Sequence, residues 1–257
     1  MRARFDVVVV GAGQAGLAVG YELARAGRDF VLLDGASRVG AAWRSRWDSL
    51  RLFTPAAVDG LPGKAFPAGR NYRPTKDEMA DFLKEYARTF DLPLRLASTV
   101  RRVFRDGYEL VAETSGGRVA APEMVIATGP YTVPRVPSFG RLLDPRVRQL
   151  HSIDYRNPGQ LRDGGVLVAG AGNSGGEIAV DVAATHRTWL SGRDTGYVPF
   201  DVDASLYQLL GRLRTDRLPG RAIAGWLAGS GTPLVRIGAP DLAAAGIERV
   251  ARVAGVT

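Results

Sequence analysis

The sequence predicts an α/β protein with two Rossmann-like dinucleotide-binding domains, which have parallel sheets, and a small antiparallel β-meander in the first domain. The pattern GxGxxG occurs twice, at residues 11–16 and 170–175. Each copy follows an apolar run and enters a helical stretch that leads to a second apolar run, which is the order of a β-turn-α-β unit. One copy alone is a weak signal, whereas two copies in the same setting indicate two related domains. We expect these domains at residues 1–160 and 161–257.

The elements of the first expected domain follow in order along the chain. Apolar runs at residues 5–10 and 30–34 predict the two strands around the first motif. Thr75, followed by Glu78, fits a capping box and predicts the start of a helix. The residues that follow at helical spacing and predict its buried face are Met79, Phe82, Leu83 and Tyr86.

Short strands joined by glycine-containing turns are predicted over residues 92–119, and these strands form the expected meander. Residues 124–129 predict a buried strand that ends in a glycine turn. The remaining expected elements are strands at 165–169 and 188–191, which flank the second motif, and helices at 206–213 and 241–247.

The three glycines of each motif have separate physical tasks. The first permits the positive φ of a tight turn, the second lets a pyrophosphate approach the backbone, and the third lets helix and strand pack closely. The free N–H groups at the start of the helix would then hold the pyrophosphate. The expected binding residues are Gly11, Gly13, Gln14, Ala15 and Gly16 in the first motif and Gly170, Gly172, Asn173, Ser174 and Gly175 in the second.

The two motifs differ at the end of the strand that follows each helix. Asp34 ends the first such strand, where a carboxylate accepts hydrogen bonds from a ribose hydroxyl and repels a 2′-phosphate. Ser191 ends the second, and Arg193 follows two residues later with a planar donor group that suits phosphate. We therefore expect FAD in the first site and NADPH in the second, which implies hydride transfer between the two cofactors.

Composition excludes several other classes of protein. The chain has no Cys and 2 His, which excludes a disulfide framework, a redox-active dithiol and a Cys- or His-based metal centre. The net charge of +8 comes from 31 Arg and 3 Lys scattered along the chain, without the basic stripe of a nucleic-acid-binding protein. No apolar stretch is long enough for a membrane span, and no signal peptide precedes the first strand. We therefore expect a cytoplasmic protein without nucleic-acid or membrane partners.

Three further segments resemble flavin-containing monooxygenases, most closely the bacterial flavoproteins of that family and the plant auxin-synthesis monooxygenases. Residues 40–55 are similar to the segment after the first Rossmann unit, and residues 127–129 are similar to the family's ATG motif. Residues 151–156 are similar to the second half of its FxGxxxHxxxY fingerprint. In the first half of that fingerprint, Pro145 and Val147 stand where Phe and Gly are expected.

The resemblance implies a single-component enzyme in which NADPH reduces FAD, the reduced flavin forms a C4a-(hydro)peroxide with O₂, and this species oxygenates a small organic substrate. It places Trp43, Arg44 and Thr54 near the flavin, with Trp43 and Thr54 as the catalytic candidates. It also adds Thr128 and Gly129 to the cofactor-binding residues.

The resemblance further implies a longer chain, because family members return from the NADPH-binding domain to complete the FAD-binding domain. The sequence ends at Thr257 before such a return, so we expect weaker retention of FAD than in longer relatives. Two other functions stay open: an NADPH–flavin reductase or oxidase that releases H₂O₂, and a shortened, catalytically idle nucleotide-binding protein. The sequence decides neither the substrate nor the oligomeric state, for which a homodimer is one option.

Overall fold

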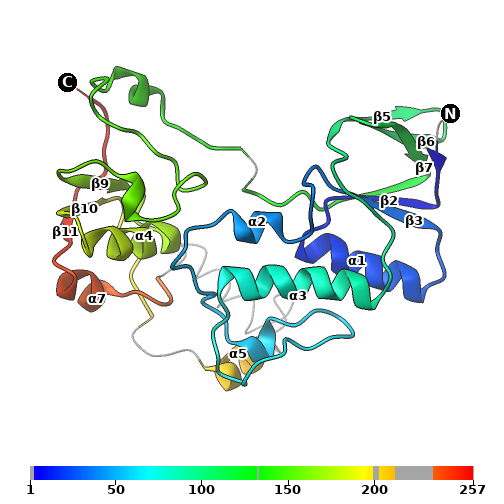
Figure 1. The fold of residues 1–257 in the computed structure, drawn as a ribbon, viewed down its shortest axis with the longest axis horizontal. Coiled ribbons are helices and arrows are strands. Elements are labelled where there is room, and N and C mark those ends of the chain that lie inside the picture. The colour runs from blue at the N-terminus through cyan, green and yellow to red at the C-terminus, as the bar shows by residue number, and fades with distance from the viewer. Residues whose placement is uncertain (1–2, 132, 199–202, 212–233, 257) are drawn as a thin grey trace, which may run out of the picture. The chain divides into compact units, whose positions relative to one another are not determined.

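The computed structural model describes residues 3–131, 133–198, 203–211 and 234–256 (Figure 1). These residues form two compact units, which are drawn from residues 1–45, 59–68 and 76–133 and from residues 46–58, 69–75 and 134–257. Each unit carries one of the two glycine motifs. The expected domain boundary after residue 160 stays a prediction.

A parallel sheet forms the centre of the first unit. Its strands lie in the order β4 (Leu94–Arg95), β3 (Phe30–Leu33), β2 (Val7–Val10) and β8 (Glu123–Ile126). Helix α1 (Gln14–Arg25) connects β2 to β3, so the first predicted β-turn-α-β unit is confirmed. The side chains of β2 and β3 are buried on both faces of the sheet, which explains their unbroken apolar runs.

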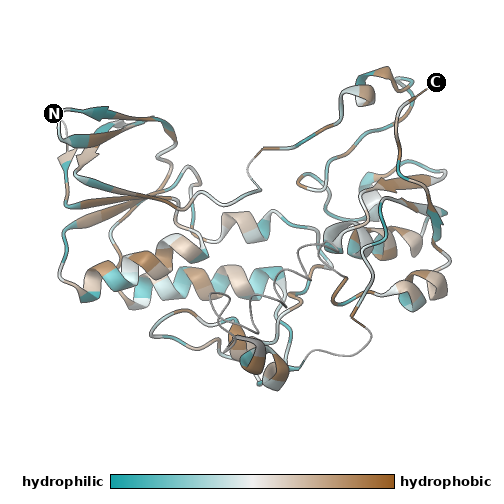
Figure 2. Cartoon of the chain, turned by 180° about the vertical axis from the view of Figure 1, so that it is seen from behind, coloured by the Kyte–Doolittle hydropathy of each residue, from teal (hydrophilic) through white to brown (hydrophobic). Residues whose placement is uncertain are grey.

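The predicted meander is confirmed over residues 100–121 and covers one face of this sheet, whereas the first short strand of the predicted range is β4 of the parallel sheet. The meander consists of β5 (Val100–Asp106), β6 (Glu109–Thr114) and β7 (Gly117–Ala121), and β1 (Ala3–Arg4) pairs parallel to β7. The shared core contains Val8, Val10, Val31 and Leu33 from the parallel sheet and Ala112, Val119 and Ala121 from the meander. Figure 2 shows this apolar content in brown along the strands.

Two helices cover the opposite face of the parallel sheet, as Figure 1 shows for α1 and for α3 (Lys76–Thr89). Helix α3 begins directly after Thr75, as its sequence predicts, and its first turn carries Asp77 and Glu78. The predicted apolar face is confirmed as core, because Met79, Phe82, Leu83 and Tyr86 are all buried. The short helix α2 (Ala41–Arg44) packs against α3, and a 3₁₀ turn, η1 (Ala56–Val58), belongs to the second unit.

A second parallel sheet organises the other unit, with strand order β11 (Glu248–Val250), β10 (Thr188–Ser191) and β9 (Val166–Ala169). Helix α4 (Asn173–Ala183) connects β9 to β10 and confirms the second predicted unit. Its core contains Ala179, Leu190, Leu234, Leu242 and Ile247. The remaining elements are α5 (Ala204–Gly211), α7 (Ala239–Ala244), η2 (Ser138–Leu142) and η3 (Pro158–Gln160).

The structure corrects three sequence-based expectations. The strand predicted as buried at 124–129 is β8, the last strand of the described sheet, and its Ile126 side chain is 61% exposed. An edge strand has a neighbour on one side only, so apolar residues alone did not reveal its exposure. The helix expected at 206–213 begins earlier, at Ala204, and residues 212 and 213 lie outside the described residues. The helix expected at 241–247 is α7, which begins earlier, after Gly238, and ends at Ala244, shortly before Gly246 with φ +69°.

Candidate functional site

The first glycine motif lies between β2 and α1, and its three glycines have three different surroundings. Gly11 has φ +106°, and a Cβ added there would lie 2.2 Å from the carbonyl oxygen of Ala127. A Cβ at Gly16 would lie 1.9 Å from the carbonyl oxygen of Gly11. At Gly13, by contrast, no described atom lies within 4 Å of that position. The fold itself therefore requires Gly11 and Gly16, whereas Gly13 faces open space in which a ligand can approach the backbone.

The second motif repeats this arrangement between β9 and α4. Gly170 has φ +120°, and a Cβ at Gly175 would lie 1.7 Å from the carbonyl oxygen of Gly170. Around Gly172, no atom of the described residues lies within 4 Å of the added Cβ. Both motifs thus leave the same position of the turn open.

The two helices that follow the motifs begin without a cap of their own. Among the described residues, no side chain caps α1 at Gly13 or α4 at Gly172, and neither first turn has an acidic residue. Two helices outside the motifs differ: α3 carries acidic residues in its first turn, and the N–H of Gly238 at the start of α7 donates to Asp241 Oδ2 at 2.7 Å. The four-residue helix α2, by contrast, also begins at a glycine, Gly40, without a side-chain cap from the described residues. The first N–H groups of α1 and α4 are therefore available to an anion, and the exposed residues Gln14, Ala15 and Ser174 stand at these ends.

Asn173 at the start of α4 makes a hydrogen bond within the chain that the sequence did not predict. Its Oδ1 accepts a hydrogen bond from the N–H of Val235 at 2.9 Å. One turn later, Glu177 lies 3.8 Å from the guanidinium of Arg236, and burial raises the pKa of this carboxyl. Asn173 and Glu177 together hold the segment around Val235 against α4.

Asp34 follows β3, and its carboxylate is fixed by the backbone. Oδ2 accepts from the N–H of Ala12 at 2.7 Å, and Oδ1 accepts from the N–H of Ala36 at 2.8 Å. Ala12 belongs to the glycine motif, so this carboxylate lies directly beside the turn. Each of its oxygens keeps a further lone pair for a ligand hydroxyl.

The equivalent position in the second motif is Gly192, which corrects the expected pairing of Ser191 with Asp34. The N–H of Gly11 donates to the carbonyl oxygen of Leu33, and the N–H of Gly170 donates to that of Ser191, both at 2.7 Å. Ser191 therefore corresponds to Leu33, and the next residue, Gly192, corresponds to Asp34. A Cβ at Gly192 would lie 2.6 Å from the backbone nitrogen of Ala171, so the chain runs directly along the turn here.

Ser191 itself is 2% exposed, and its hydroxyl is engaged in packing. The hydroxyl donates to the carbonyl oxygen of Ala251 at 2.8 Å and accepts from the N–H of Val253 at 3.0 Å. Arg193, two residues later, is exposed, and no described carboxylate pairs with its guanidinium. Its neighbour Asp194 pairs with Arg249 at 3.5 Å.

The residues that the resemblance placed near the flavin lie in both units. Trp43 and Arg44 belong to α2, and the Arg44 guanidinium pairs with Asp77 at 3.5 Å and with Asp81. Thr54 is half-buried and belongs to the second unit. A common site for Trp43 and Thr54 therefore stays a prediction.

The ATG segment packs against the first glycine motif. The N–H of Ala127 donates to the carbonyl oxygen of Val10 at 2.7 Å, which continues the pairing of β8 with β2. Thr128 is exposed, and Gly129 has φ +72°, a left-handed conformation that glycine adopts easily. The turn that contains Thr128 and Gly129 thus stands at the same end of the sheet as the motif.

The fingerprint residues hold the linker in place inside the second unit. The Tyr155 hydroxyl donates to Asp181 Oδ2 on α4 at 2.6 Å, and burial together with this carboxylate raises the pKa of the phenol. His151 Nδ1 accepts from the N–H of Ile153 at 3.2 Å. The N–H of Asp48 donates to the carbonyl oxygen of Arg156 at 2.7 Å, which ties the segment before Thr54 to the fingerprint. These contacts favour structural roles.

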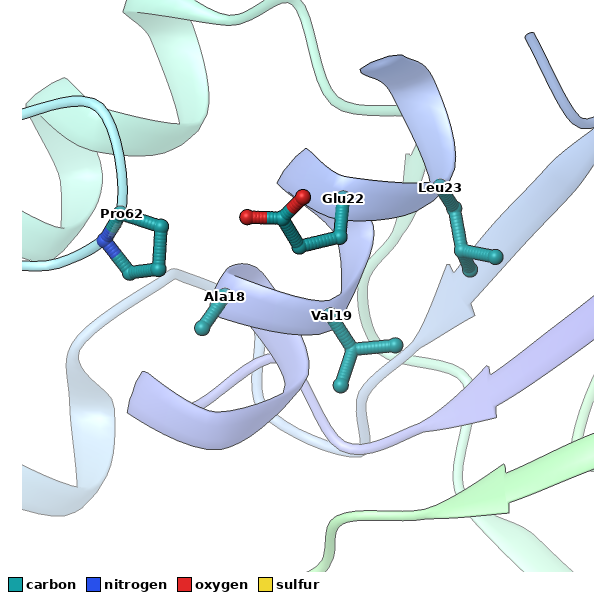
Figure 3. Close-up of a pocket in the computed structure, with 5 residues that line it drawn as sticks. All are labelled: Ala18, Val19, Glu22, Leu23 and Pro62. Carbon is teal, nitrogen blue, oxygen red and sulfur yellow. The ribbon is translucent and has the colours of Figure 1, made fainter. Parts of the chain in front are cut away.

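A pocket in the first unit lies along the side of α1, away from the glycine turn at its start (Figure 3). Its volume is about 360 Å³, and it is lined by Ala18, Val19, Glu22, Leu23 and Pro62. The one charged group in it, Glu22, pairs with Arg25 at 3.1 Å. Within the described residues, no three His, Cys, Asp or Glu side chains gather as a metal site, and no helix is long and apolar enough to cross a membrane.

Comparison with known proteins agrees with this geometry. A family model described as pyridine nucleotide-disulphide oxidoreductase matches residues 8–206. The chain belongs to this family. The chain has no Cys and therefore cannot form the disulphide to which the family description refers.

Individual relatives carry the names of oxidoreductases and flavin monooxygenases. An uncharacterised CzcO-like oxidoreductase from Geobacillus kaustophilus is 42% identical over 77% of this chain and 57% of its own length. The probable indole-3-pyruvate monooxygenase YUCCA3 from Arabidopsis thaliana is 33% identical over 68% of this chain and 43% of its own length. The structure of the flavin-containing monooxygenase from Stenotrophomonas maltophilia is 28% identical, with a TM-score of 0.80 over 99% of this chain and 72% of that one. The resemblance to flavin-containing monooxygenases is thus confirmed, and the chain spans about half the length of the curated relatives.

Proposed function

We propose that this chain carries the FAD-binding and NADPH-binding parts of a flavoprotein monooxygenase. The observation that carries the proposal is the pair of uncapped helix starts at Gly13 and Gly172, each beside an open position in a glycine turn. Two such anion-binding ends match two dinucleotides, each with its own pyrophosphate. The similarity to a flavin-containing monooxygenase over 99% of this chain supports the same reading.

FAD fits the first motif. The carboxylate of Asp34 is held beside the turn by Ala12 and can accept hydrogen bonds from the hydroxyls of an unphosphorylated ribose. A negative charge at this position disfavours a 2′-phosphate. Trp43, Arg44, Thr128 and Gly129 complete the proposed flavin surroundings.

NADPH fits the second motif. Gly192 replaces the acidic residue, so no carboxylate occupies the position that corresponds to Asp34. The exposed guanidinium of Arg193 follows at once and can donate two parallel hydrogen bonds to a phosphate group. The Ser191 hydroxyl stabilises this strand end because it is hydrogen-bonded to Ala251 and Val253, so it does not face a ligand.

The chemistry that the cofactors supply when bound is hydride transfer from NADPH to FAD and oxygen transfer from O₂ to a small organic substrate. The tasks of the chain are to bind both dinucleotides, to orient their rings and to exclude water. Trp43 and Thr54 are the proposed catalytic residues because of the resemblance, Trp43 as a large aromatic wall and Thr54 as a hydrogen-bonding hydroxyl.

The visible spectrum of the purified protein tests this proposal. With added FAD, we expect a perturbed flavin spectrum, which anaerobic NADPH bleaches. In air, NADPH consumption that yields an oxygenated product and no H₂O₂ indicates a monooxygenase. Release of one H₂O₂ for each NADPH consumed indicates an oxidase. A protein that perturbs no flavin spectrum and does not oxidise NADPH contradicts the proposal.

A further inference from the structure

The ion pair between Asp194 and Arg249 lies next to the residue that we assign to the 2′-phosphate. Asp194 is the immediate neighbour of Arg193, and its Oδ1 lies 3.5 Å from Arg249 Nη1. The same oxygen accepts a hydrogen bond from the N–H of Gly196 at 2.9 Å. The Asp194 side chain is 70% exposed and that of Arg249 is 26% exposed, so Arg249 is the better anchored partner.

Asp194 poses an electrostatic problem for a phosphate in this place. An uncompensated carboxylate next to Arg193 would repel a phosphate and would also attract the Arg193 guanidinium to itself. Arg249 reduces both effects, because it places a positive charge 3.5 Å from the Asp194 carboxylate. Together the side chains of Arg193, Asp194 and Arg249 carry a net charge of +1.

The register of the sheet places Arg249 beside the end of β10. Strand β11 pairs parallel to β10, with Arg249 opposite Leu190 and Val250 opposite Ser191. Parallel strands end at the same edge of a sheet, so Arg249 approaches the residues that follow β10. Gly192, in turn, runs against Ala171 of the glycine motif, which keeps this edge beside the turn.

Resting on the proposed function, we infer that Arg249 is a positioning residue for the preference of the second site for a 2′-phosphorylated dinucleotide. It acts through Asp194, whose charge it offsets, and leaves Arg193 free to bind the phosphate. When Arg249 is removed, the uncompensated carboxylate of Asp194 lowers the preference of the second site for NADP⁺ over NAD⁺.

Equilibrium binding of NADP⁺ and NAD⁺ to the full chain, measured by calorimetry, tests this inference without any turnover. We expect Arg249→Ala to weaken NADP⁺ binding about fivefold to tenfold and NAD⁺ binding less than about twofold, because only NADP⁺ carries the phosphate. Asp194→Asn should strengthen NADP⁺ binding selectively. The double variant should return close to the wild-type ratio of dissociation constants, and Arg249→Lys should keep most of the NADP⁺ preference.

The matched control is Arg187→Ala. Arg187 forms an ion pair of the same kind with Glu248, at 2.8 Å, but it precedes β10 and stands at the opposite end of the same two strands. It should leave the ratio of the two dissociation constants unchanged. Equal weakening of NADP⁺ and NAD⁺ by Arg249→Ala, or no rescue by Asp194→Asn, overturns the inference while the proposed function stands. A wild-type chain that binds neither dinucleotide overturns both.

Discussion

The two glycine motifs have the same turn and different strand ends. Gly11 and Gly170 both have positive φ, and both third glycines pack against the carbonyl oxygen of the first. The residues that follow the next strand are unrelated: a carboxylate fixed by two backbone N–H groups in one case, and a glycine followed by an exposed arginine in the other. The same turn is thus joined to two different strand ends, and under the proposed function the turn would bind the pyrophosphate whereas the strand end would select the ribose.

The largest expected effect tests the shared part of the motifs. Gly16→Ala and Gly175→Ala each place a Cβ within 2 Å of a backbone oxygen, at 1.9 and 1.7 Å. We expect each change to lower the free energy of unfolding by about 3 kcal/mol, as measured by urea denaturation. Gly13→Ala and Gly172→Ala are the controls, because their backbones have φ −81° and −84° and their Cβ positions are open. Equal stability of all four variants would contradict the claim that the fold requires the third glycine of each motif but not the second.

The next effect separates the two ligands. Gly13→Val and Gly172→Val place their Cβ in open space, since no described atom beyond the neighbouring residues lies within 4 Å of that position, and urea denaturation checks that the fold of each variant is kept. Each should block one pyrophosphate: Gly13→Val should weaken FAD binding at least about tenfold, and Gly172→Val should do the same for NADP⁺. Quenching of FAD fluorescence and calorimetry with NADP⁺ measure the two affinities. If both variants weaken the same ligand, the motifs do not form two separate sites.

A smaller effect is expected at the strand end of the first motif. Asp34→Asn replaces one accepting oxygen by a donor that faces a backbone N–H, of Ala12 or of Ala36. We expect FAD binding to weaken about tenfold, since a hydrogen bond to a charged group is lost. Asp29→Asn, an exposed change in the same unit, serves as the control in the same fluorescence titration. Unchanged FAD affinity in Asp34→Asn would remove this carboxylate from the site.

The smallest effect sharpens the assignment at the second strand end. Ser191→Ala removes a hydroxyl that joins Ala251 and Val253, so the free energy of unfolding should fall by about 1 kcal/mol. The ratio of the dissociation constants of NADP⁺ and NAD⁺ should stay the same. A selective loss of NADP⁺ binding would instead put the hydroxyl at the phosphate and would weaken the case for Arg193.

Much of the fold could be predicted because its signals are local. The glycine spacing, the apolar runs of β2 and β3 and the helical face of Met79 and Tyr86 are each contained within a short window of sequence. The exposure of Ile126 could not be predicted in this way, because it depends on which strands lie beside β8.

The candidate site shows the same division. Asp34 could be predicted because it ends the strand that follows the first motif, whereas the equivalence of Gly192 depends on which carbonyl accepts a hydrogen bond from the N–H of Gly170. Arg249 was missed because its partner Asp194 is far away in the sequence, and only the pairing of β11 with β10 brings them together. The order Gly192, Arg193 and Asp194 after β10 was a signal in the sequence that the acidic residue at the end of β3 has no equivalent in the second motif.

The two backbone hydrogen bonds of Asp34 have an entropic consequence. A side chain whose rotamer is frozen before any ligand arrives loses no conformational freedom on binding. The Arg193 side chain is exposed to solvent and makes no such hydrogen bond to the described backbone, so it must lose conformational freedom when it binds an anion. A ligand of the proposed first site would therefore meet a preorganised carboxylate, whereas a ligand of the proposed second site would have to order the Arg193 side chain on binding.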